Sequence, residues 1–317
     1  MIYTITLNPS IDYVIQIDQL KLGSLNKMDN EAKFPGGKGI NVSRVLDRLH
    51  YTNTALGFLG GFTGDYIAEQ LQQQAINSDF ISIKGETRVN IKLKSDQETE
   101  INSHGPDILP EETEKLLQQL QKVTKQDTVV LSGSTPPSLP TDYYEKLVEE
   151  IVHAGGAFVV DTTGDSLTSV LPYGPLLVKP NLEELGELFH VTLNSRDEVI
   201  HYGKKLVDLG AKHAIVSMAG DGALLFTKEG IFQGNSPEGD VKNSVGAGDS
   251  MIAGFTGTYN KTKDALEAFR MALAAGSATA FSTDLATGAY IQELRKQISL
   301  TQIAEMDKRK DENHEDH

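Results

Sequence analysis

The stretch NSVGAGDSMIAGF, residues 243–255, places small residues and one aspartate directly before an apolar helical pattern. Met251, Ile252 and Phe255 recur at helical spacing, so we expect a helix to begin close to Gly248. The first turn of a helix carries N–H groups without partners and the positive end of the helix dipole, and small residues let an anion approach them. The stretch therefore predicts an anion-binding helix start.

Asp249 lies in that first turn, where a carboxylate can simply stabilise the start of the helix. A carboxylate beside an anion site would repel the bound anion unless it accepts a proton there. A general base that takes a hydroxyl proton while a phosphoryl group lies on the N–H groups of Gly246, Ala247 and Gly248 explains both features. We therefore predict phosphoryl transfer with Asp249 as the base, with the helix-start charge as the alternative.

A second glycine-rich helix start is FPGGKGINVSRVLDRL, residues 34–49. It is not a P-loop, because that motif needs four residues between its first glycine and the Gly-Lys, followed by Ser or Thr. Gly36 and Gly37 free the backbone to meet a ligand with many hydroxyls, Lys38 follows where the backbone is open, and Asn41 can donate and accept on the same side. A structural tight turn is the alternative. Two such helix starts predict two ligands.

The elements that must position these residues follow a strand, loop, helix rhythm. The β-branched runs TVVLSG, GAFVVDTTG, PLLVKPN and HAIVSMAG alternate with helical patterns such as YYEKLVEEIVHAG. This rhythm indicates an α/β fold with a parallel sheet, right-handed crossovers and helices on the sheet. Because ligands of such sheets bind beyond the carboxyl ends of the strands, we expect the site in the loops that follow these runs.

Two stretches depart from the rhythm, because they alternate apolar and polar residues at period two. They begin at IDYVIQ and at TRVNIK, and the second contains the polar turn SDQE and is typical of a hairpin. We assign them to a small antiparallel β flap, or lid, formed by about 12–34 and 86–103; an edge extension of the main sheet is the alternative. A single domain is expected over 1–305, followed by a charged tail over 306–317.

Composition excludes several classes of protein. The net charge of −15 argues against binding to nucleic acid or to an anionic membrane surface, because phosphate backbones are held by clustered Lys and Arg. The absence of cysteine excludes disulfides, thiolate metal sites and cysteine nucleophiles. The sequence offers neither a signal peptide nor a run of about 20 apolar residues, so we expect a cytoplasmic protein.

The two glycine-rich stretches resemble the signatures of a known family. PGGKGIN and NSVGAGD are similar to the two signatures of the ribokinase-like (PfkB) carbohydrate kinases, and the spacing and intervening loops agree along nearly the whole chain. TLNPSID, TEINSHGP and LSGSTPP resemble the branch of this family that acts on hexose phosphates. Many members carry Asp-Thr where this chain has Asn243 and Ser244, a variant that the hexose-phosphate branch often shows.

The resemblance implies a three-layer α/β/α fold with a central, mostly parallel sheet and a lid. It implies ATP- and Mg²⁺-dependent transfer of the γ-phosphate to the 6-hydroxyl of D-fructose 1-phosphate, with tagatose 6-phosphate as the alternative substrate. Asp249 is then the base, and the N–H groups from Gly246 to Asp249 hold the charge of the transferring group, as the residues alone also predict. Lids of this family often pair across a dimer, which implies a homodimer through the lid.

The resemblance also assigns residues to each ligand. The residues implied for the sugar phosphate are Asp12, Lys27, Gly36, Gly37, Lys38, Asn41, Arg88, Asn90, Ser132 and Ser134, with Lys27, Arg88 and the two serines at its phosphate. The residues implied for ATP are Lys179, Asn181, Ser217, Gly220, Gly222, Gly276 and Ser277. Glu184 is implied for Mg²⁺, through water.

Several of these residues also fit purely structural roles. Asn181 and Glu184 fit a helix cap with an acidic first turn, GDG at 220–222 fits a hairpin turn, and Gly276 fits helix packing. A noncatalytic sugar-phosphate sensor could use the same scaffold, although a pure binder needs no base. A dinucleotide dehydrogenase needs G-x-G-x-x-G after an early strand, whereas residues 246–251 read GAGDSM late in the chain.

Overall fold

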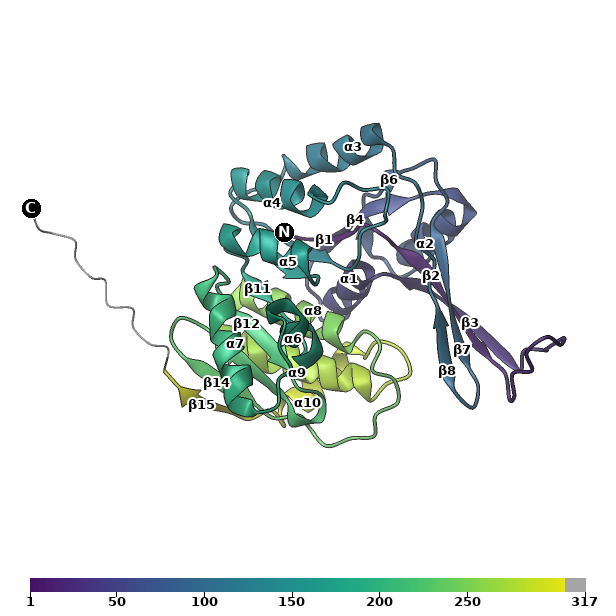
Figure 1. Ribbon diagram of the computed structural model, residues 1–317. Helices are drawn as coiled ribbons and strands as arrows, with labels where there is room; N and C mark the ends of the chain where they lie inside the picture. The colour runs from purple at the N-terminus through teal and green to yellow at the C-terminus, as the bar shows by residue number, and fades with distance from the viewer. Residues whose placement is uncertain (306–317) are drawn as a thin grey trace, which may run out of the picture.

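The computed structural model describes residues 1–305, so the charged tail expected over 306–317 lies outside the described residues. The strands of the main sheet are β1 (Ile2–Thr6), β4 (Asn53–Leu59), β5 (Asn77–Ser78), β6 (Ile81–Ser82), β9 (Thr128–Ser132), β10 (Ala157–Asp161), β11 (Leu177–Val178), β12 (Ala214–Ser217), β13 (Ala223–Phe226), β14 (Ile231–Gly234) and β15 (Leu300–Ala304). Their order is β15-β14-β13-β12-β11-β10-β9-β1-β4-β5, with β6 also paired to β4 (Figure 1).

The centre of this sheet is parallel, as the strand and helix rhythm predicts. β1 pairs in parallel with β4 and β9, and the parallel pairing continues through β10 and β11 to β12. Central strands of this kind are covered on both faces, and β9 is accordingly a continuous buried run that includes Val129, Val130 and Leu131. The last three strands, β13 to β15, add an antiparallel edge.

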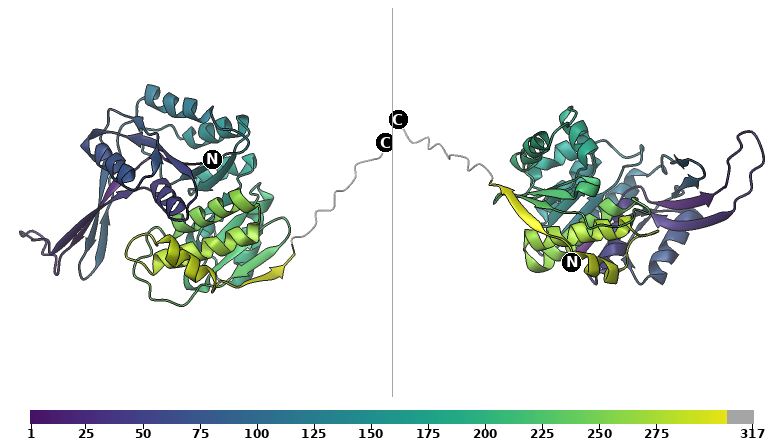
Figure 2. Two further views of the ribbon diagram at one scale, coloured as in Figure 1. Left: turned by 180° about the vertical axis from the view of Figure 1, so that it is seen from behind. Right: turned by 90° about the horizontal axis from the view of Figure 1, so that it is seen from below.

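Helices cover both faces of the sheet and complete three layers. They are α1 (Lys38–Arg48), α2 (Gly61–Gln73), α3 (Pro110–Leu120), α4 (Tyr143–His153), α5 (Asp165–Val170), α6 (Leu182–Phe189), α7 (Arg196–Asp208), α8 (Ala247–Thr262), α9 (Ala265–Ala280) and α10 (Gly288–Arg295), with short 3₁₀ turns η1 (Leu171–Tyr173) and η2 (Ala219–Asp221). One core cluster packs α3, α4, α5, α6 and α7 against one face of the sheet, and a second packs α1, α8, α9 and α10 against the other face. Figure 2 shows helices on both sides of the sheet. No helix of the described residues is long and apolar enough to cross a membrane.

The lid is a separate four-stranded sheet that projects from the main body (Figures 1 and 2). Its strands are β2 (Ser10–Gln16), β3 (Asn30–Gly36), β7 (Arg88–Lys94) and β8 (Glu98–Ile101), in the order β3-β2-β7-β8. The lid and its hairpin are therefore confirmed, and the edge extension is not observed. The β2–β3 and β7–β8 pairs are antiparallel, as expected, but the central β2–β7 pair is parallel because both strands leave the main body in the same direction.

Candidate active site

Two cavities meet where α8 begins, beyond the carboxyl ends of the parallel strands, as such sheets predict. The larger cavity, about 810 Å³, lies between the β12–β13 turn, the starts of α6 and α8, and α9. The smaller cavity, about 420 Å³, lies between the lid, the start of α1 and the ends of β1, β9 and β10. Within residues 1–305, only Asn181 and Gly248 line both cavities. A group can therefore pass from one ligand to the other at the start of α8.

The start of α8 has the geometry of an anion site. The helix begins at Ala247, next to the predicted position, and its N-cap Gly246 has a left-handed conformation with φ of 80°. A Cβ at Gly246 would lie 2.7 Å from the Leu285 side chain, so both the backbone angle and the contact select glycine. Ser250 fixes this turn, because its hydroxyl donates to the carbonyl of Gly246 at 2.8 Å. The N–H groups of the first turn are thus held toward the junction of the cavities.

Asp249 lies at this junction on the side of the smaller cavity. Asp249 is only 5% exposed, and its Oδ2 accepts a hydrogen bond of 2.9 Å from Nδ2 of Asn41. Burial, followed by the negative charge of Asp161, raises the pKa of Asp249 to about 6. Asp249 is therefore ionised at neutral pH yet more basic than an exposed aspartate, which suits a general base.

Asp161, at the end of β10, is a buried carboxylate that sequence reasoning did not assign to the site. Its Oδ2 lies 3.1 Å from Nζ of Lys38, and its Oδ1 lies 3.7 Å from Nζ of Lys179. Burial lowers the pKa of Lys38, but the negative charges of Asp161 and Asp249 raise it by more than burial lowers it. The pKa of Lys38 is therefore above its ordinary value. Asp161 thus holds two ammonium groups beside the start of α8. The signal was an aspartate at the carboxyl end of a buried strand.

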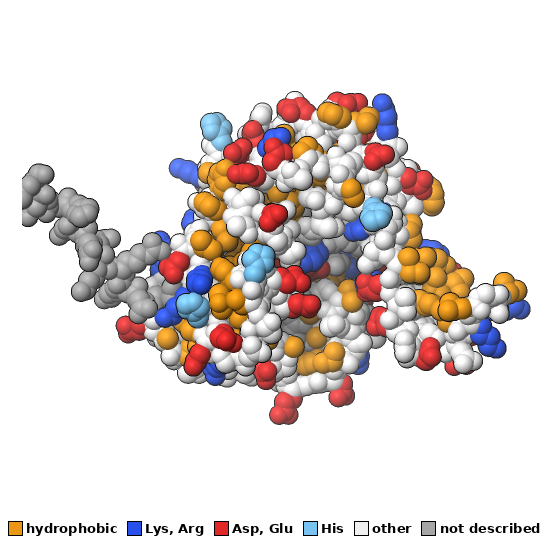
Figure 3. Space-filling model, in the orientation of Figure 1, with side chains coloured by type: hydrophobic (Ala, Val, Ile, Leu, Met, Phe, Trp, Pro, Cys, Tyr) orange, Lys and Arg blue, Asp and Glu red, His pale blue; other side chains and the backbone are white. Residues whose placement is uncertain are grey.

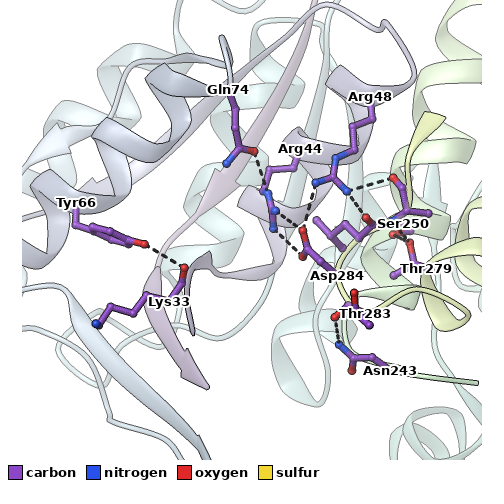
Figure 4. Close-up of polar contacts among 12 residues, drawn as sticks. Lys33, Arg44, Arg48, Tyr66, Gln74, Asn243, Ser250, Thr279, Thr283 and Asp284 are labelled. Atoms are coloured by element: carbon purple, nitrogen blue, oxygen red, sulfur yellow. Dashed lines mark hydrogen bonds and ion pairs between the residues drawn. The ribbon is translucent and has the colours of Figure 1, made fainter. Parts of the chain in front are cut away.

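Ion pairs fix α1 to the loop that supports the start of α8 (Figure 4). Arg44 donates to Asp284 at 2.7 Å, and Arg48 donates to the same carboxylate at 3.3 Å. The Asn243 amide donates to the carbonyl of Thr283 at 3.3 Å. The residue that replaces the more common Asp in the family signature therefore anchors the segment before the anion site. These contacts join the two glycine-rich helix starts into one unit.

Most residues predicted for the sugar phosphate line the smaller cavity. They are Asp12, Gly37, Lys38, Asn41, Arg88, Asn90, Ser132 and Ser134. Gly36 lies directly behind Asp12, because a Cβ at Gly36 would approach the Asp12 carboxyl carbon to 2.5 Å. Lys27 is the exception: it lies in the exposed loop between β2 and β3 and does not line the cavity of its own chain.

Three residues that line this cavity carry a buried side-chain oxygen without a partner. Thr6 Oγ1, Asn8 Oδ1 and Ser132 Oγ are buried and make no hydrogen bond within the described residues. Buried polar atoms nearly always have partners, so three unpaired oxygens in the wall of one cavity are unusual. Thr6 and Asn8 were missed because a threonine in a strand and an asparagine in a turn have ordinary structural uses. The cavity is polar in a way that fits a carbohydrate.

The guanidinium of Arg88 is already engaged. Its Nε and Nη2 donate to the carbonyl of Asn8 at 3.2 and 2.9 Å, and its Nη1 donates to the carbonyl of Ser103 at 2.8 Å. Burial lowers the pKa of Arg88. Arg88 therefore connects the lid to the segments on either side of it, at the carbonyls of Asn8 and Ser103. Only its remaining N–H groups are available to bind a phosphate.

The residues predicted for the nucleotide line the larger cavity, with one exception. Asn181, Ser217, Gly220, Gly222, Gly276 and Ser277 are among its lining residues. The structural alternatives hold as well, because β12 and β13 form an antiparallel hairpin and a Cβ at Gly276 would lie 2.6 Å from Met251. Lys179 lines the smaller cavity instead, and a Cβ at Gly248 would lie 3.0 Å from its Nζ. Its ammonium therefore lies against the start of α8.

Asn181 and Glu184 form a capping box at the start of α6, the structural alternative that the sequence left open. The N–H of Glu184 donates to Oδ1 of Asn181 at 2.8 Å, and the N–H of Asn181 donates to Oε2 of Glu184 at 2.9 Å. Both side chains also line the smaller cavity, and Asn181 reaches the larger one. The box fixes the Glu184 carboxylate beside the junction, which is compatible with a metal bound through water.

A three-layer α/β fold with a buried aspartate of raised pKa at the junction of two cavities fits the class of phosphotransferases that act on a hydroxyl acceptor. The family model "pfkB family carbohydrate kinase" matches residues 5–290, and the chain belongs to this family of sugar kinases.

Named relatives agree with this assignment. The chain is 48% identical over 303 residues to a 1-phosphofructokinase of Bacillus subtilis (strain 168), covering 96% of this chain and 100% of the relative. It is 36% identical over 304 residues to a D-tagatose-1-phosphate kinase of Bacillus licheniformis, covering 96% and 100%. Among solved structures, phosphofructokinase-2 from Escherichia coli in complex with fructose-6-phosphate aligns with a TM-score of 0.88 at 28% identity, covering 93% of this chain and 98% of that one.

Proposed function

We propose that this protein is an ATP-dependent 1-phosphofructokinase, which phosphorylates the 6-hydroxyl of D-fructose 1-phosphate to give fructose 1,6-bisphosphate. One observation carries the reaction type: Asp249 is buried at the junction of a sugar-sized polar cavity and a larger second cavity. The 48% identity to a 1-phosphofructokinase over nearly the whole length of both chains carries the substrate.

The residues of the chain divide the work of the transfer. Asp249 accepts the proton of the 6-hydroxyl, and Asn41 orients the carboxylate for that step. The N–H groups at the start of α8 stabilise the charge of the transferring group, together with the ammonium groups of Lys38 and Lys179. ATP, when bound in the larger cavity, supplies the γ-phosphoryl group. Closure of the lid over the smaller cavity excludes water and so limits hydrolysis.

The metal that we propose is Mg²⁺, near Glu184. A hard cation of this kind is typically held by one or two carboxylates, water and substrate phosphates rather than by a cage of protein ligands. Glu184 fits this pattern, because its carboxylate lines the cavity next to Asn181, which borders both cavities. When bound, Mg²⁺ would neutralise the charge of the nucleotide phosphates.

An assay of ADP release with ATP and Mg²⁺ tests the substrate. We expect kcat/KM for fructose 1-phosphate to exceed that for tagatose 6-phosphate and for fructose 6-phosphate by roughly 10²-fold, because a site built to bind particular hydroxyl groups discriminates strongly. A preference for tagatose 6-phosphate would keep the mechanism and overturn the substrate. Binding of a sugar phosphate without any turnover would favour the noncatalytic sensor.

We propose in addition that the protein acts in the cytoplasm as a homodimer that forms through the lid. Hydrophobic side chains gather on the lid (Figure 3), and the β2–β3 loop exposes Leu22 and Leu25 almost fully, at 89% and 90%. Exposed apolar side chains that lie together on one surface are typical of a protein interface.

Light scattering tests the dimer. Replacing both Leu22 and Leu25 with Lys should convert a dimer to a monomer, because charged side chains would have to be desolvated in the interface. Leu209→Lys is the matched control, since Leu209 is an exposed leucine outside the lid, and it should leave the dimer intact. A monomeric unsubstituted protein at micromolar concentration would contradict the proposal.

A further inference from the structure

Lys92, on β7, is a cation of the sugar cavity that the reaction described above does not use. Its side chain lines the smaller cavity and is only 13% exposed. Its Nζ lies 3.2 Å from Oε1 of Glu100, which is on the neighbouring strand β8 and is 42% exposed. The other carboxylate oxygen of Glu100 accepts a long hydrogen bond of 3.4 Å from the amide of Asn102. Lys92 is thus a sheltered ammonium whose partner can turn to solvent.

The other positively charged side chains of this cavity already have partners. Among the described residues, the Lys and Arg side chains that line it are Lys38, Arg88, Lys92 and Lys179. Lys38 and Lys179 flank Asp161 on the side where the transfer takes place. Arg88 donates three N–H groups to backbone carbonyls at the root of the lid. The phosphate that the substrate already carries is a dianion at neutral pH and needs more positive charge than Arg88 supplies.

The register of the lid places Lys92 where that phosphate should lie. Asp12 pairs with Asn90 across β2 and β7, and Asn90 Nδ2 lies 3.3 Å from Oδ1 of Asp12, so both face the sugar. Lys92 is two residues farther along β7, on the same face and roughly 7 Å farther from the main body. If the 6-hydroxyl lies at Asp249, at the start of α8, the rest of the sugar extends along the cavity, whose lid side includes Lys92.

We propose that Lys92 binds the phosphate of the incoming sugar phosphate and so helps to select phosphorylated substrates. In the free enzyme Glu100 holds the ammonium in place, and the phosphate displaces Glu100 toward solvent when the substrate binds. This inference rests on the proposed function, and it adds a specificity residue at the lid end of the same cavity. Charge-assisted hydrogen bonds to phosphate are among the strongest polar contacts in proteins.

Steady-state kinetics of Lys92→Met and Glu100→Gln test the proposal. Lys92→Met should raise KM for fructose 1-phosphate at least tenfold, with kcat and KM for ATP changed less than threefold. Glu100→Gln removes a competitor for the ammonium and a repulsion to the phosphate, so it should leave KM for fructose 1-phosphate equal or lower. Lys94→Met is the matched control, because Lys94 is exposed, lies on the same strand and does not line the cavity; it should change nothing.

The opposite effects of the two substitutions separate binding from lid structure. If the Lys92 and Glu100 pair only stiffens the lid, both substitutions should raise KM alike, and that result would overturn the proposal; an unchanged KM for Lys92→Met would overturn it as well. Calorimetric titration of fructose 1-phosphate without ATP should show the same weakening for Lys92→Met. An unsubstituted enzyme that neither binds nor turns over fructose 1-phosphate would refute the proposed function itself, a distinct outcome.

Discussion

Asp249→Asn should lower kcat by roughly 10²–10⁴ and leave the binding of both substrates nearly unchanged, because a positioned base contributes about that factor. The substitution keeps the shape of the side chain and its place in the first turn of α8, but asparagine cannot accept the proton of the 6-hydroxyl. It also removes a buried negative charge near the transferring phosphoryl group, so KM for ATP should rise little or fall. Kinetics with fructose 1-phosphate and ATP, each at saturation, measure the loss directly.

A matched control and a pH profile make this prediction specific. Asp240→Asn changes an exposed aspartate of the preceding loop that lines neither cavity, and it should keep full activity. Activity of the unsubstituted enzyme should fall about tenfold per pH unit below pH 6, because Asp249 has a pKa of about 6 and is protonated at lower pH. This fall is the acid limb of the pH profile. Full activity of Asp249→Asn would assign the proton transfer to another group.

Much of this site could be predicted from the sequence, because its local signals are strong. The start of α8 follows from small residues before an apolar helical stripe, and the lid follows from period-two alternation, patterns that depend on few neighbours. The parallel β2–β7 pair could not be predicted, since strand direction in the lid depends on how the chain returns from the main sheet.

Individual contacts were less accessible to sequence reasoning. Asp161 ends a strand, as many aspartates do, and only the fold brings to it Lys38, from the start of α1, and Lys179, from the end of the neighbouring strand β11. Lys92 reads as one polar residue of an alternating strand, and its place in the cavity depends on which face of the lid turns toward the main body. The structural alternatives considered for Asn181 and Gly276 prove compatible with cavity positions, because a cap or a helix contact can also form a wall.

Asp161→Asn should move the acid limb of the pH profile to lower pH. The negative charge of Asp161 contributes to the raised pKa of Asp249, second only to burial. Without that charge, the ammonium groups of Lys38 and Lys179 act on Asp249 uncompensated, so both changes favour the ionised form of Asp249 and lower its pKa. The loss of the shared partner also frees the two ammonium groups, so kcat at neutral pH should fall by roughly 10- to 100-fold, less than the loss for a group that takes the proton itself.

Comparison of the two profiles isolates this effect. The phosphate of the substrate also titrates near pH 6, but equally for both enzymes, so the difference between the limbs belongs to the protein. Removing a carboxylate from between two ammonium groups also destabilises the fold, so the profiles should be measured at a temperature where circular dichroism shows both proteins folded. If Asp161 only stabilises the fold, the pH of the acid limb should be unchanged while the melting temperature falls. An acid limb at lower pH together with a reduced kcat means that one buried carboxylate both positions the two lysines and raises the pKa of Asp249.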